Sequence, residues 1–187
     1  MGREKAKKIL FVAIVSLLGC ILINTVANQL LAQTGSTGLQ PAKIGQIIDG
    51  DTLDVSLSQC RIPWRGNPQR CRVVLACIDA PDLGQDPFYQ DAKKRLEQLL
   101  ASGSVMLRDT GNTSQGRIVA ELFLSNQSVN LQMVREGKAV VFCRHLNNCA
   151  GSRNAYLNAE AAAKNEGLGV WNPRQSWKPR EPRPCPS

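Results

Sequence analysis

The sequence is poor in the residues on which many enzyme active sites depend. Its 187 residues include a single histidine, His145, and aromatic side chains make up only 5% of the chain. A metal centre built from several imidazoles is therefore excluded. The sequence also lacks a G-x-S-x-G nucleophile elbow, a P-loop and a G-x-G-x-x-G fingerprint, which argues against hydrolases of that type, NTPases and dinucleotide enzymes. Any chemistry has to use carboxylates, arginines, lysines or a thiol.

The length and charge of the chain set further bounds. The chain is long enough for one domain with a sizeable core, and its 43% of apolar residues argues against disorder. The formal net charge is +8, of which residues 1–32 and residues 172–187 each carry +3, so the central part carries only +2. Because most of the excess lies at the two ends, the basic charge is weak evidence for a nucleic-acid partner.

The first residues have the pattern of an export segment. A basic stretch is followed by an almost wholly apolar run, Ile9–Ile23, as in a signal peptide or a membrane anchor spanning 1–32. Three outcomes stay open: cleavage after Ala27 or Ala32, retention as an anchor, or lipoprotein processing at Cys20. In each of them this segment inserts into a membrane at least transiently. We therefore expect an exported protein that is either secreted or anchored.

Cysteine usage agrees with export, because six cysteines lie outside that segment: Cys60, Cys71, Cys77, Cys143, Cys149 and Cys185. An even number in an exported chain predicts disulfides, although six cysteines allow 15 pairings. The short loops favour Cys60 with Cys71 and Cys143 with Cys149. Cys77 lies in an apolar strand pattern and reads as a free, small apolar residue.

The exported part has three predicted regions. Residues 33–41 read as a polar linker, residues 42–171 as a domain, and residues 172–187, with five of the ten prolines, as an extended tail. In the domain we predict a helix that Asp86 caps and that has Pro87 in its first turn. The predicted strands cover 43–48, 52–57, 71–78, 105–108, 118–124 and 138–142, and the predicted helices 86–100, 129–136 and 154–166. This order suits a small closed barrel with packed helices.

Three segments carry candidate chemistry. Asp49-Gly50-Asp51-Thr52 alone reads as a hairpin turn, and Ile78-Asp79-Ala80-Pro81-Asp82 alone reads as the end of a strand. Gly116-Arg117 alone carries no signal. Their combination in this order, with a helix between the second and the third, is far more specific than any one of them.

This combination resembles the staphylococcal nuclease (thermonuclease) family. The resemblance runs from about Lys43 to Trp171 and extends to the segments 129–139 and 159–171. It implies an α+β, mainly β, fold: an OB-fold five-stranded barrel with three packed helices. It also implies Ca²⁺-dependent hydrolysis of phosphodiester bonds in DNA, RNA or both, by a protein that we expect to be a monomer.

The resemblance implies roles for individual residues. Asp51 and Asp79 match the metal-binding carboxylates, and the carbonyl of Ala80 matches a third ligand. Hard oxygen ligands are the kind that Ca²⁺ prefers, so no histidine is needed. Asp49 and Thr52 match positions just outside this ligand set.

Two further positions would act on the substrate. Asp82 stands where the family has glutamate, as the base or as the group that orients water. Arg117 matches the arginine that stabilises the transition state and assists the leaving group.

The sequence departs from the family at the substrate side of the site. Val74 occupies the position of a strand arginine, and we expect Arg72, two residues earlier on the same strand face, to replace it in part. Tyrosines that stack on substrate in the family have no counterpart at Gln115 or in the segment 143–145. The alternative is therefore an OB-fold module that binds nucleic acid or another polyanion without cleaving it.

Overall fold

The structure, a computed structural model, describes residues 38–174 together with Trp177 and Cys185. The predicted export segment, residues 33–37 of the predicted linker and most of the predicted tail lie outside the described residues. Within the described part, no helix has both the length and the apolar character needed to cross a membrane.

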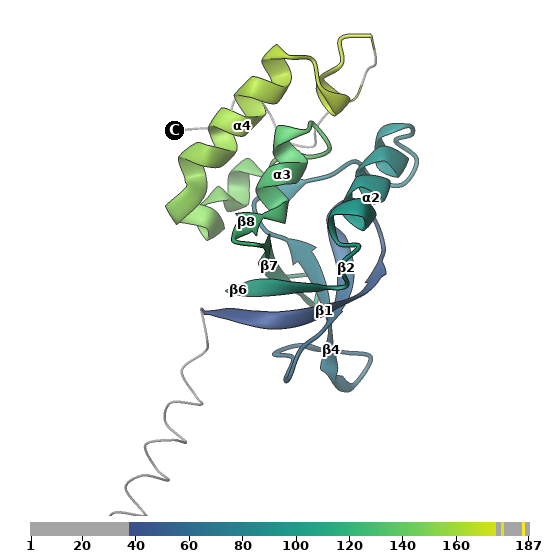
Figure 1. The fold of residues 1–187 in the computed structure, drawn as a ribbon, viewed down its shortest axis with the longest axis vertical. Coiled ribbons are helices and arrows are strands. Elements are labelled where there is room, and N and C mark those ends of the chain that lie inside the picture. The colour runs from purple at the N-terminus through teal and green to yellow at the C-terminus, as the bar shows by residue number, and fades with distance from the viewer. Residues whose placement is uncertain (1–37, 175–176, 178–184, 186–187) are drawn as a thin grey trace, which may run out of the picture. The chain divides into compact units, whose positions relative to one another are not determined.

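Five long strands form a closed barrel (Figure 1). The antiparallel order places β1 between β2 and β6, while β4 follows β2 and β7 follows β6. A parallel pairing of β4 with β7 then closes the sheet on itself. The strands are β1 (Leu39–Ile47), β2 (Thr52–Ser56), β4 (Asn67–Leu75), β6 (Ser104–Ser114) and β7 (Arg117–Leu124). This topology confirms the predicted five-stranded OB-fold barrel.

Alternation of side chains along β4 shows how the sequence defines the barrel interior. Cys71, Val73 and Leu75 are almost completely buried, whereas Arg72 and Val74 between them are only half-buried. Successive side chains of a strand point to opposite faces, so the first set fills the barrel and the second faces outward. The same strand therefore carries core residues and residues available to a surface site.

The segments between the long strands contain more regular structure than the sequence predicted. The region 58–70, which falls between two predicted strands, forms a hairpin from β3 (Pro63–Trp64) and the first part of β4. The polar segment 109–115, which also falls between predicted strands, extends β6 to Ser114, with a register irregularity between Asp109 and Thr113. Three further short strands are β5 (Ile78–Asp79), β8 (Gln127–Ser128) and β9 (Val140–Val141).

Three α-helices lie within the described residues, as predicted: α2 (Phe88–Leu99), α3 (Val129–Arg135) and α4 (Arg153–Asn165). Two 3-10 segments, η1 (Cys143–Ser152) and η2 (Gly169–Trp171), flank α4. The predicted capping of α2 by Asp86 is wrong: Pro87 occupies the cap position and no side chain caps this helix. At α3, by contrast, the hydroxyl of Ser128 accepts a hydrogen bond from the N–H of Leu131, as expected of an N-cap serine.

A buried asparagine attaches α3 to the barrel. The side-chain amide of Asn130 donates hydrogen bonds to the carbonyls of Ala76 and Ala120, at 3.0 and 3.2 Å. Its carbonyl oxygen accepts from the N–H of Leu122 at 3.0 Å. All of its bonds run to main-chain groups, so this residue fixes the helix against the end of β7 without a cost in unpaired polar atoms.

A buried tyrosine, Tyr156, holds helix α4 to the barrel. The hydroxyl of Tyr156 donates to the carboxylate of Glu121 in β7 at 2.7 Å, and Arg108 of β6 pairs with the same carboxylate. Burial raises the pKa of Tyr156 to about 12. The tyrosine therefore stays protonated and keeps donating at any physiological pH.

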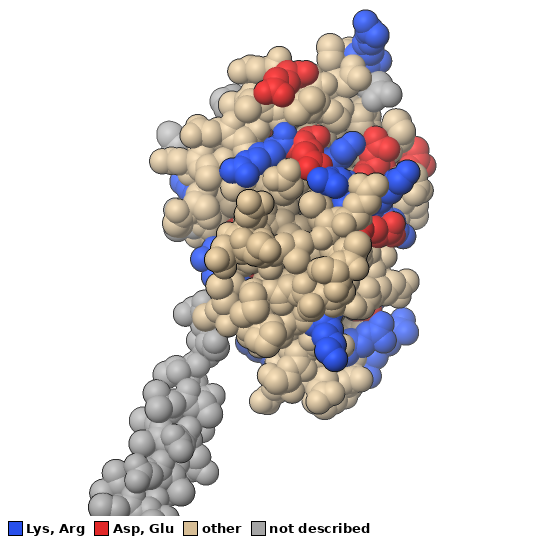
Figure 2. Space-filling model, viewed as in Figure 1, with Lys and Arg blue, Asp and Glu red and all other residues tan. Residues whose placement is uncertain are grey.

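Ion pairs on the surface connect helix α2 with the residues that directly follow helix α3. Arg95 binds Glu136 through two hydrogen bonds of 2.5 and 2.6 Å, and Lys138 lies 3.5 Å from Asp91. Over the helices, Figure 2 shows acidic and basic side chains side by side. Charge is therefore locally balanced at this end of the molecule.

All six cysteines outside the export segment are paired. The predicted bridge Cys60–Cys71 is present, with the Cα atoms 5.6 Å apart. The predicted bridge Cys143–Cys149 is wrong: Cys149 pairs with Cys77, and Cys143 pairs with Cys185 in the tail. Proximity along the chain misled this prediction, because η1 folds back onto the start of β5 and brings Cys149 to Cys77 across 72 residues of sequence.

Candidate active site

The turn between β1 and β2 is built to present carboxylates. The side chain of Asp49 accepts hydrogen bonds from the N–H groups of Asp51 and Thr52, at 2.9 and 2.6 Å. At position 50 a Cβ would lie 2.6 Å from the Cβ of Ala92 and 2.8 Å from that of Ala80. Only glycine fits in this space, so the turn packs directly on α2 and on the end of β5.

The end of β5 brings the second carboxylate to the first. Asp79 is buried, and the N–H of the next residue, Ala80, donates to the carboxylate of Asp51 at 3.0 Å. Thr52 donates to the other oxygen of the same carboxylate at 3.1 Å. Asp51, in the turn before β2, and Asp79, in β5, thus lie next to each other.

The electrostatics of this point favour a cation. Burial of the carboxylate, followed by the nearby charge of Asp49, raises the pKa of Asp51 to about 7; Asp79 adds to this rise, and the N–H of Ala80 opposes it. Like charges held together out of water disfavour one another. A bound cation would offset the cost of burying the charged carboxylate of Asp51 and its repulsion by Asp49 and Asp79.

Arg117 faces the carboxylates from the start of β7. Its Nε donates to the carbonyl of Ser114 at 3.1 Å, which fixes the side chain over the hairpin turn. Its Nη1 donates to the hydroxyl of Thr52 at 3.3 Å. Thr52 therefore connects the guanidinium of Arg117 to the carboxylate of Asp51, and the predicted metal and substrate groups form one hydrogen-bonded set.

Asp82 lies on the exposed loop that follows β5. Its N–H donates to the side chain of Gln85 at 2.6 Å, and the indole N–H of Trp177 donates to the same side-chain oxygen of Gln85 at 3.1 Å. These bonds shape the loop and leave the carboxyl group of Asp82 at the wall of the cavity described next. An exposed carboxylate in this place is suited to contact water.

A cavity of about 400 Å³ collects most of the predicted site residues: Asp49, Asp51, Thr52, Asp79, Asp82 and Arg117 all line it. Ala80 does not line it; only its N–H is seen to act, on Asp51. Val74 lines the cavity at the place where the family has arginine. The predicted carboxylates and Arg117 therefore line one cavity, and the roles assigned to them stay predictions.

Arg72 points elsewhere. Its Nε donates to the buried carboxylate of Asp54 at 2.7 Å, and its guanidinium carbon lies 4.0 Å from the ring centroid of Trp64. It is not among the residues that line the cavity. A catalytic role for Arg72 therefore stays a prediction that requires its guanidinium to leave Asp54.

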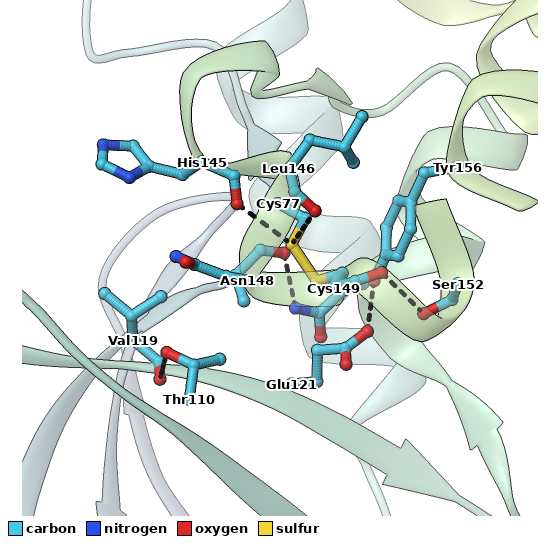
Figure 3. Close-up of a disulfide and its surroundings, with 12 residues drawn as sticks. Cys77, Thr110, Val119, Glu121, His145, Leu146, Asn148, Cys149, Ser152 and Tyr156 are labelled. Carbon is cyan, nitrogen blue, oxygen red and sulfur yellow. Dashed lines mark hydrogen bonds between the residues drawn. A yellow bond between two sulfur atoms is a disulfide. The ribbon is translucent and has the colours of Figure 1, made fainter. Parts of the chain in front are cut away.

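The opposite wall of the cavity was not found from the sequence. It includes Asn112 from the extended part of β6, Gln115 from the turn after β6, and His145 and Asn148 from η1. The disulfide Cys77–Cys149 ties η1 to the strand that leads to Asp79, and Figure 3 shows His145 and Asn148 extending from η1 to the same side. Position 115 was noted only because it lacks tyrosine, and His145 also as the single histidine of the chain, while the two asparagines carry no signal in one sequence.

The donor set fits a hard divalent cation bound in an open site. Within the described residues, no three side chains of the types His, Cys, Asp and Glu converge into a complete set of metal ligands. A cation held by Asp51 and Asp79 would therefore need main-chain oxygens and water as further ligands. Ca²⁺ takes such mixed oxygen ligands readily, so the residues present are compatible with this ion.

Comparisons with known proteins identify the family of the chain. The sequence profile of the family described as "Staphylococcal nuclease homologue" matches residues 72–173. The chain is 32% identical over 129 residues to an "Uncharacterized endonuclease" of Haemophilus influenzae, which covers 69% of this chain and 65% of that protein. It is 28% identical over 137 residues to the "SPbeta prophage-derived endonuclease YokF" of Bacillus subtilis, covering 69% and 43%. To the "Micrococcal nuclease" of Shigella flexneri it is 29% identical over 148 residues, covering 73% and 78%.

The matches cover different shares of the relatives. The matched part spans 65% and 43% of the first two relatives, so similarity concerns a domain and not the whole of those proteins. The family profile, however, covers more than half of this chain, including Asp79, Asp82 and Arg117. The resemblance inferred from the motifs is thus confirmed: this chain belongs to the staphylococcal nuclease homologue family.

Proposed function

We propose that the protein is a Ca²⁺-dependent nuclease that hydrolyses phosphodiester bonds of DNA, RNA or both. The observation that carries this proposal is the meeting of Asp51, Asp79 and Arg117 at one cavity. Two carboxylates and a guanidinium, with no imidazole or free thiol among them, suit a reaction in which negative charge builds up on a phosphate. The names of two relatives, an endonuclease and a micrococcal nuclease, support the same reaction.

The residues divide the work of hydrolysis between them. A Ca²⁺ ion, when bound, supplies positive charge next to the phosphate oxygens. Asp82 orients the attacking water and accepts its proton as the new oxygen–phosphorus bond forms. Arg117 donates hydrogen bonds to the phosphate oxygens and stabilises the charge that develops as the bond to the leaving oxygen breaks. Thr52 keeps Arg117 and Asp51 in a fixed relation.

The test is nicking of plasmid DNA and degradation of single-stranded DNA and RNA by residues 33–187. We expect cleavage with Ca²⁺ and none with an excess of chelator. Cleavage that continues in chelator would contradict the metal requirement. The ratio of rates on DNA and RNA would show which substrate is preferred.

A second candidate is a binding module that does not cleave. It is favoured by Val74, which lines the cavity where the family carries a guanidinium. Loss of a preorganised cation from the transition state can slow a reaction by several orders of magnitude. Binding of nucleic acid in chelator, combined with no cleavage in Ca²⁺, would select this candidate.

We further propose that the protein is exported, either secreted or anchored by the segment 1–32. The pairing of all six remaining cysteines supports this, because structural disulfides persist in oxidising compartments. Export predicts that protein isolated from cells carries the three bridges, as peptide mapping without reduction would detect. Recovery of six free thiols from alkylated cells would contradict export.

A further inference from the structure

Arginines gather on one hairpin outside the cavity. Residues 60–72 include Arg61, Arg65, Arg70 and Arg72, and this segment contains no acidic residue. It consists of β3 and the start of β4, and the disulfide Cys60–Cys71 closes it. We call this hairpin the arginine arm. Figure 2 shows basic side chains gathered at the lower end of the molecule, where Figure 1 places the hairpin.

The structure uses only part of the charge of the arginine arm. Two carboxylates contact it: Asp54 pairs with Arg70 and Arg72, and Asp109 pairs with Arg61. The side chains of Arg61 and Arg70 remain 42% and 43% exposed in these pairs, and Arg65 is exposed as well. Four guanidinium groups against two carboxylates leave an excess of positive charge with hydrogen-bond donors directed to solvent.

The arm also carries a flat stacking surface. The guanidinium carbon of Arg72 lies 4.0 Å from the ring centroid of Trp64, and that of Arg65 lies 5.8 Å from it. Planar guanidinium and indole groups stack on nucleobases, whereas a lysine-rich surface offers only point charges. Because Arg72 lies over the indole ring, the group that the arm offers to a base is the exposed guanidinium of Arg65, next to phosphate donors on the same hairpin.

The arm is physically continuous with the candidate active site. Arg61 donates to the carbonyl of Asn112 at 3.0 Å, and Asn112 lines the cavity. Along β4, Arg72 is two residues from Val74, which also lines the cavity, a separation of roughly 6–7 Å along a strand. A polynucleotide whose phosphate lies at Arg117 can therefore reach the arm within a few nucleotides.

We propose that the arginine arm is a second binding site for the substrate, which holds the single-stranded nucleic acid beyond the scissile phosphate. The outward guanidinium groups bind backbone phosphates, and the exposed guanidinium of Arg65 stacks a base. This inference rests on the proposed function. A membrane surface is the less suitable partner, because Arg65, Gly66 and Asn67 at the exposed tip are polar, and Trp64 beside them is half-buried with guanidinium groups over its ring.

Binding in chelator tests the arm independently of cleavage. The full-length protein in neutral detergent micelles is titrated with a long labelled oligothymidylate over a range of salt concentrations. For Arg65→Gln/Arg70→Gln we expect a Kd about tenfold higher at low salt and a slope of log K against log salt that is shallower by about 1.4, two phosphate contacts on a single strand. Arg65→Gln alone, which leaves the Asp54 pairs intact, should change the slope by about 0.7.

A matched control removes the same charge elsewhere. Lys94→Gln/Arg135→Gln changes two exposed residues on α2 and α3 and should leave the Kd and the slope near the wild-type values. Equal effects of the control and the arm variant would overturn the proposal, since only net charge would then matter. The proposal would also be overturned if the arm variant lost binding to phosphatidylserine vesicles but kept its Kd for the oligonucleotide.

Cleavage separates this proposal from the proposed function. With Ca²⁺, the arm variant should show a raised KM on the long oligonucleotide and an unchanged rate on a thymidine ester with a single phosphodiester. Wild type that binds in chelator but cleaves neither substrate would refute the nuclease and leave the arm in place. Wild type that cleaves, with binding unaffected by the arm variant, would refute the arm alone.

Discussion

At the scale of single residues, Gly50 shows how tightly the acidic turn is fitted. A Cβ at this position would meet the Cβ atoms of Ala92 and Ala80 well inside van der Waals contact. We therefore predict that Gly50→Ala lowers the free energy of unfolding by about 1–3 kcal/mol through overpacking, and lowers cleavage by moving Asp51. Urea unfolding and a nicking assay would measure both. Gly151→Ala is the control, because nothing lies near a Cβ there and its backbone is not in the left-handed region; equal losses of cleavage in the two variants would contradict the argument.

The two buried carboxylates give the most direct prediction on metal dependence. Asp51→Asn with Asp79→Asn removes both charges at nearly constant shape, so we expect a folded protein with no Ca²⁺-dependent cleavage. Ca²⁺ should raise the melting temperature of wild type by mass action and leave that of the double variant unchanged. Undiminished cleavage in the double variant would contradict the assignment of these residues as metal ligands.

Val74 allows a gain-of-function prediction. Its side chain lines the cavity, so Val74→Arg places a guanidinium near the phosphate and should raise the cleavage rate about a hundredfold, which corresponds to roughly 2.7 kcal/mol. Arg72→Ala should lower stability more than turnover, because Arg72 is bound to Asp54. A hundredfold drop in turnover for Arg72→Ala, at unchanged stability, would show instead that Arg72 reaches the substrate.

At the scale of elements, the segment η1 depends on one covalent bond for its position beside the cavity. Cys77–Cys149 joins it to the strand end that precedes Asp79, and His145 and Asn148 of η1 line the cavity. We predict that Cys77→Ala/Cys149→Ala lowers the free energy of unfolding by about 2–4 kcal/mol and also lowers cleavage. Cys143→Ala/Cys185→Ala, which releases the tail, should lower stability with little change in cleavage. If both pairs reduced cleavage alike, the special position of η1 would be disproved.

The elements also show how far a single sequence leads. The barrel strands and the three helices were predictable because apolar periodicity and turn residues determine them locally, and the acidic site was predictable because its motifs resemble a family. The pairing of Cys77 with Cys149 was not, since it depends on the path of η1 through space and not on sequence distance. The contact of Arg72 with Asp54 was missed for a similar reason: strand alternation gives the face of a side chain, but the neighbouring strand, β2, supplies its partner.

At the scale of the whole molecule, charge is arranged in distinct regions. The cavity has an acidic wall, the helices carry balanced ion pairs, and the arginine arm carries an excess of arginine. The net charge alone could not reveal this arrangement, because most of that charge comes from the two ends of the chain and only a small part from the domain. The separation is physically consistent with a protein that binds a cation at one place and a polyanion at the adjoining one.

Paired carboxylates predict how the whole domain responds to acid. Burial alone would raise the pKa of Asp54, but hydrogen bonds from Arg72 and Arg70 outweigh it and hold this pKa below its usual value. For Glu136, likewise, hydrogen bonds from Arg95 and Gln132 outweigh burial and lower the pKa. A carboxyl group with a lower pKa in the folded state stabilises the fold above its unfolded pKa, and this stabilisation is lost as the pH falls through the folded pKa.

The domain should therefore lose stability below about pH 4, where the carboxyl groups of the unfolded chain take up protons. Asp54→Asn should cost about 1–3 kcal/mol at pH 7, because the two guanidinium groups lose a charged acceptor. The Asp54→Asn variant should also lose less stability than wild type when the pH is lowered from 7 to 3, because position 54 no longer titrates. Urea unfolding of both proteins at the two pH values would measure the difference. An equal loss in the two proteins would mean that Asp54 does not contribute to the acid response, and that other carboxylates, with Glu136 the first to test, carry it.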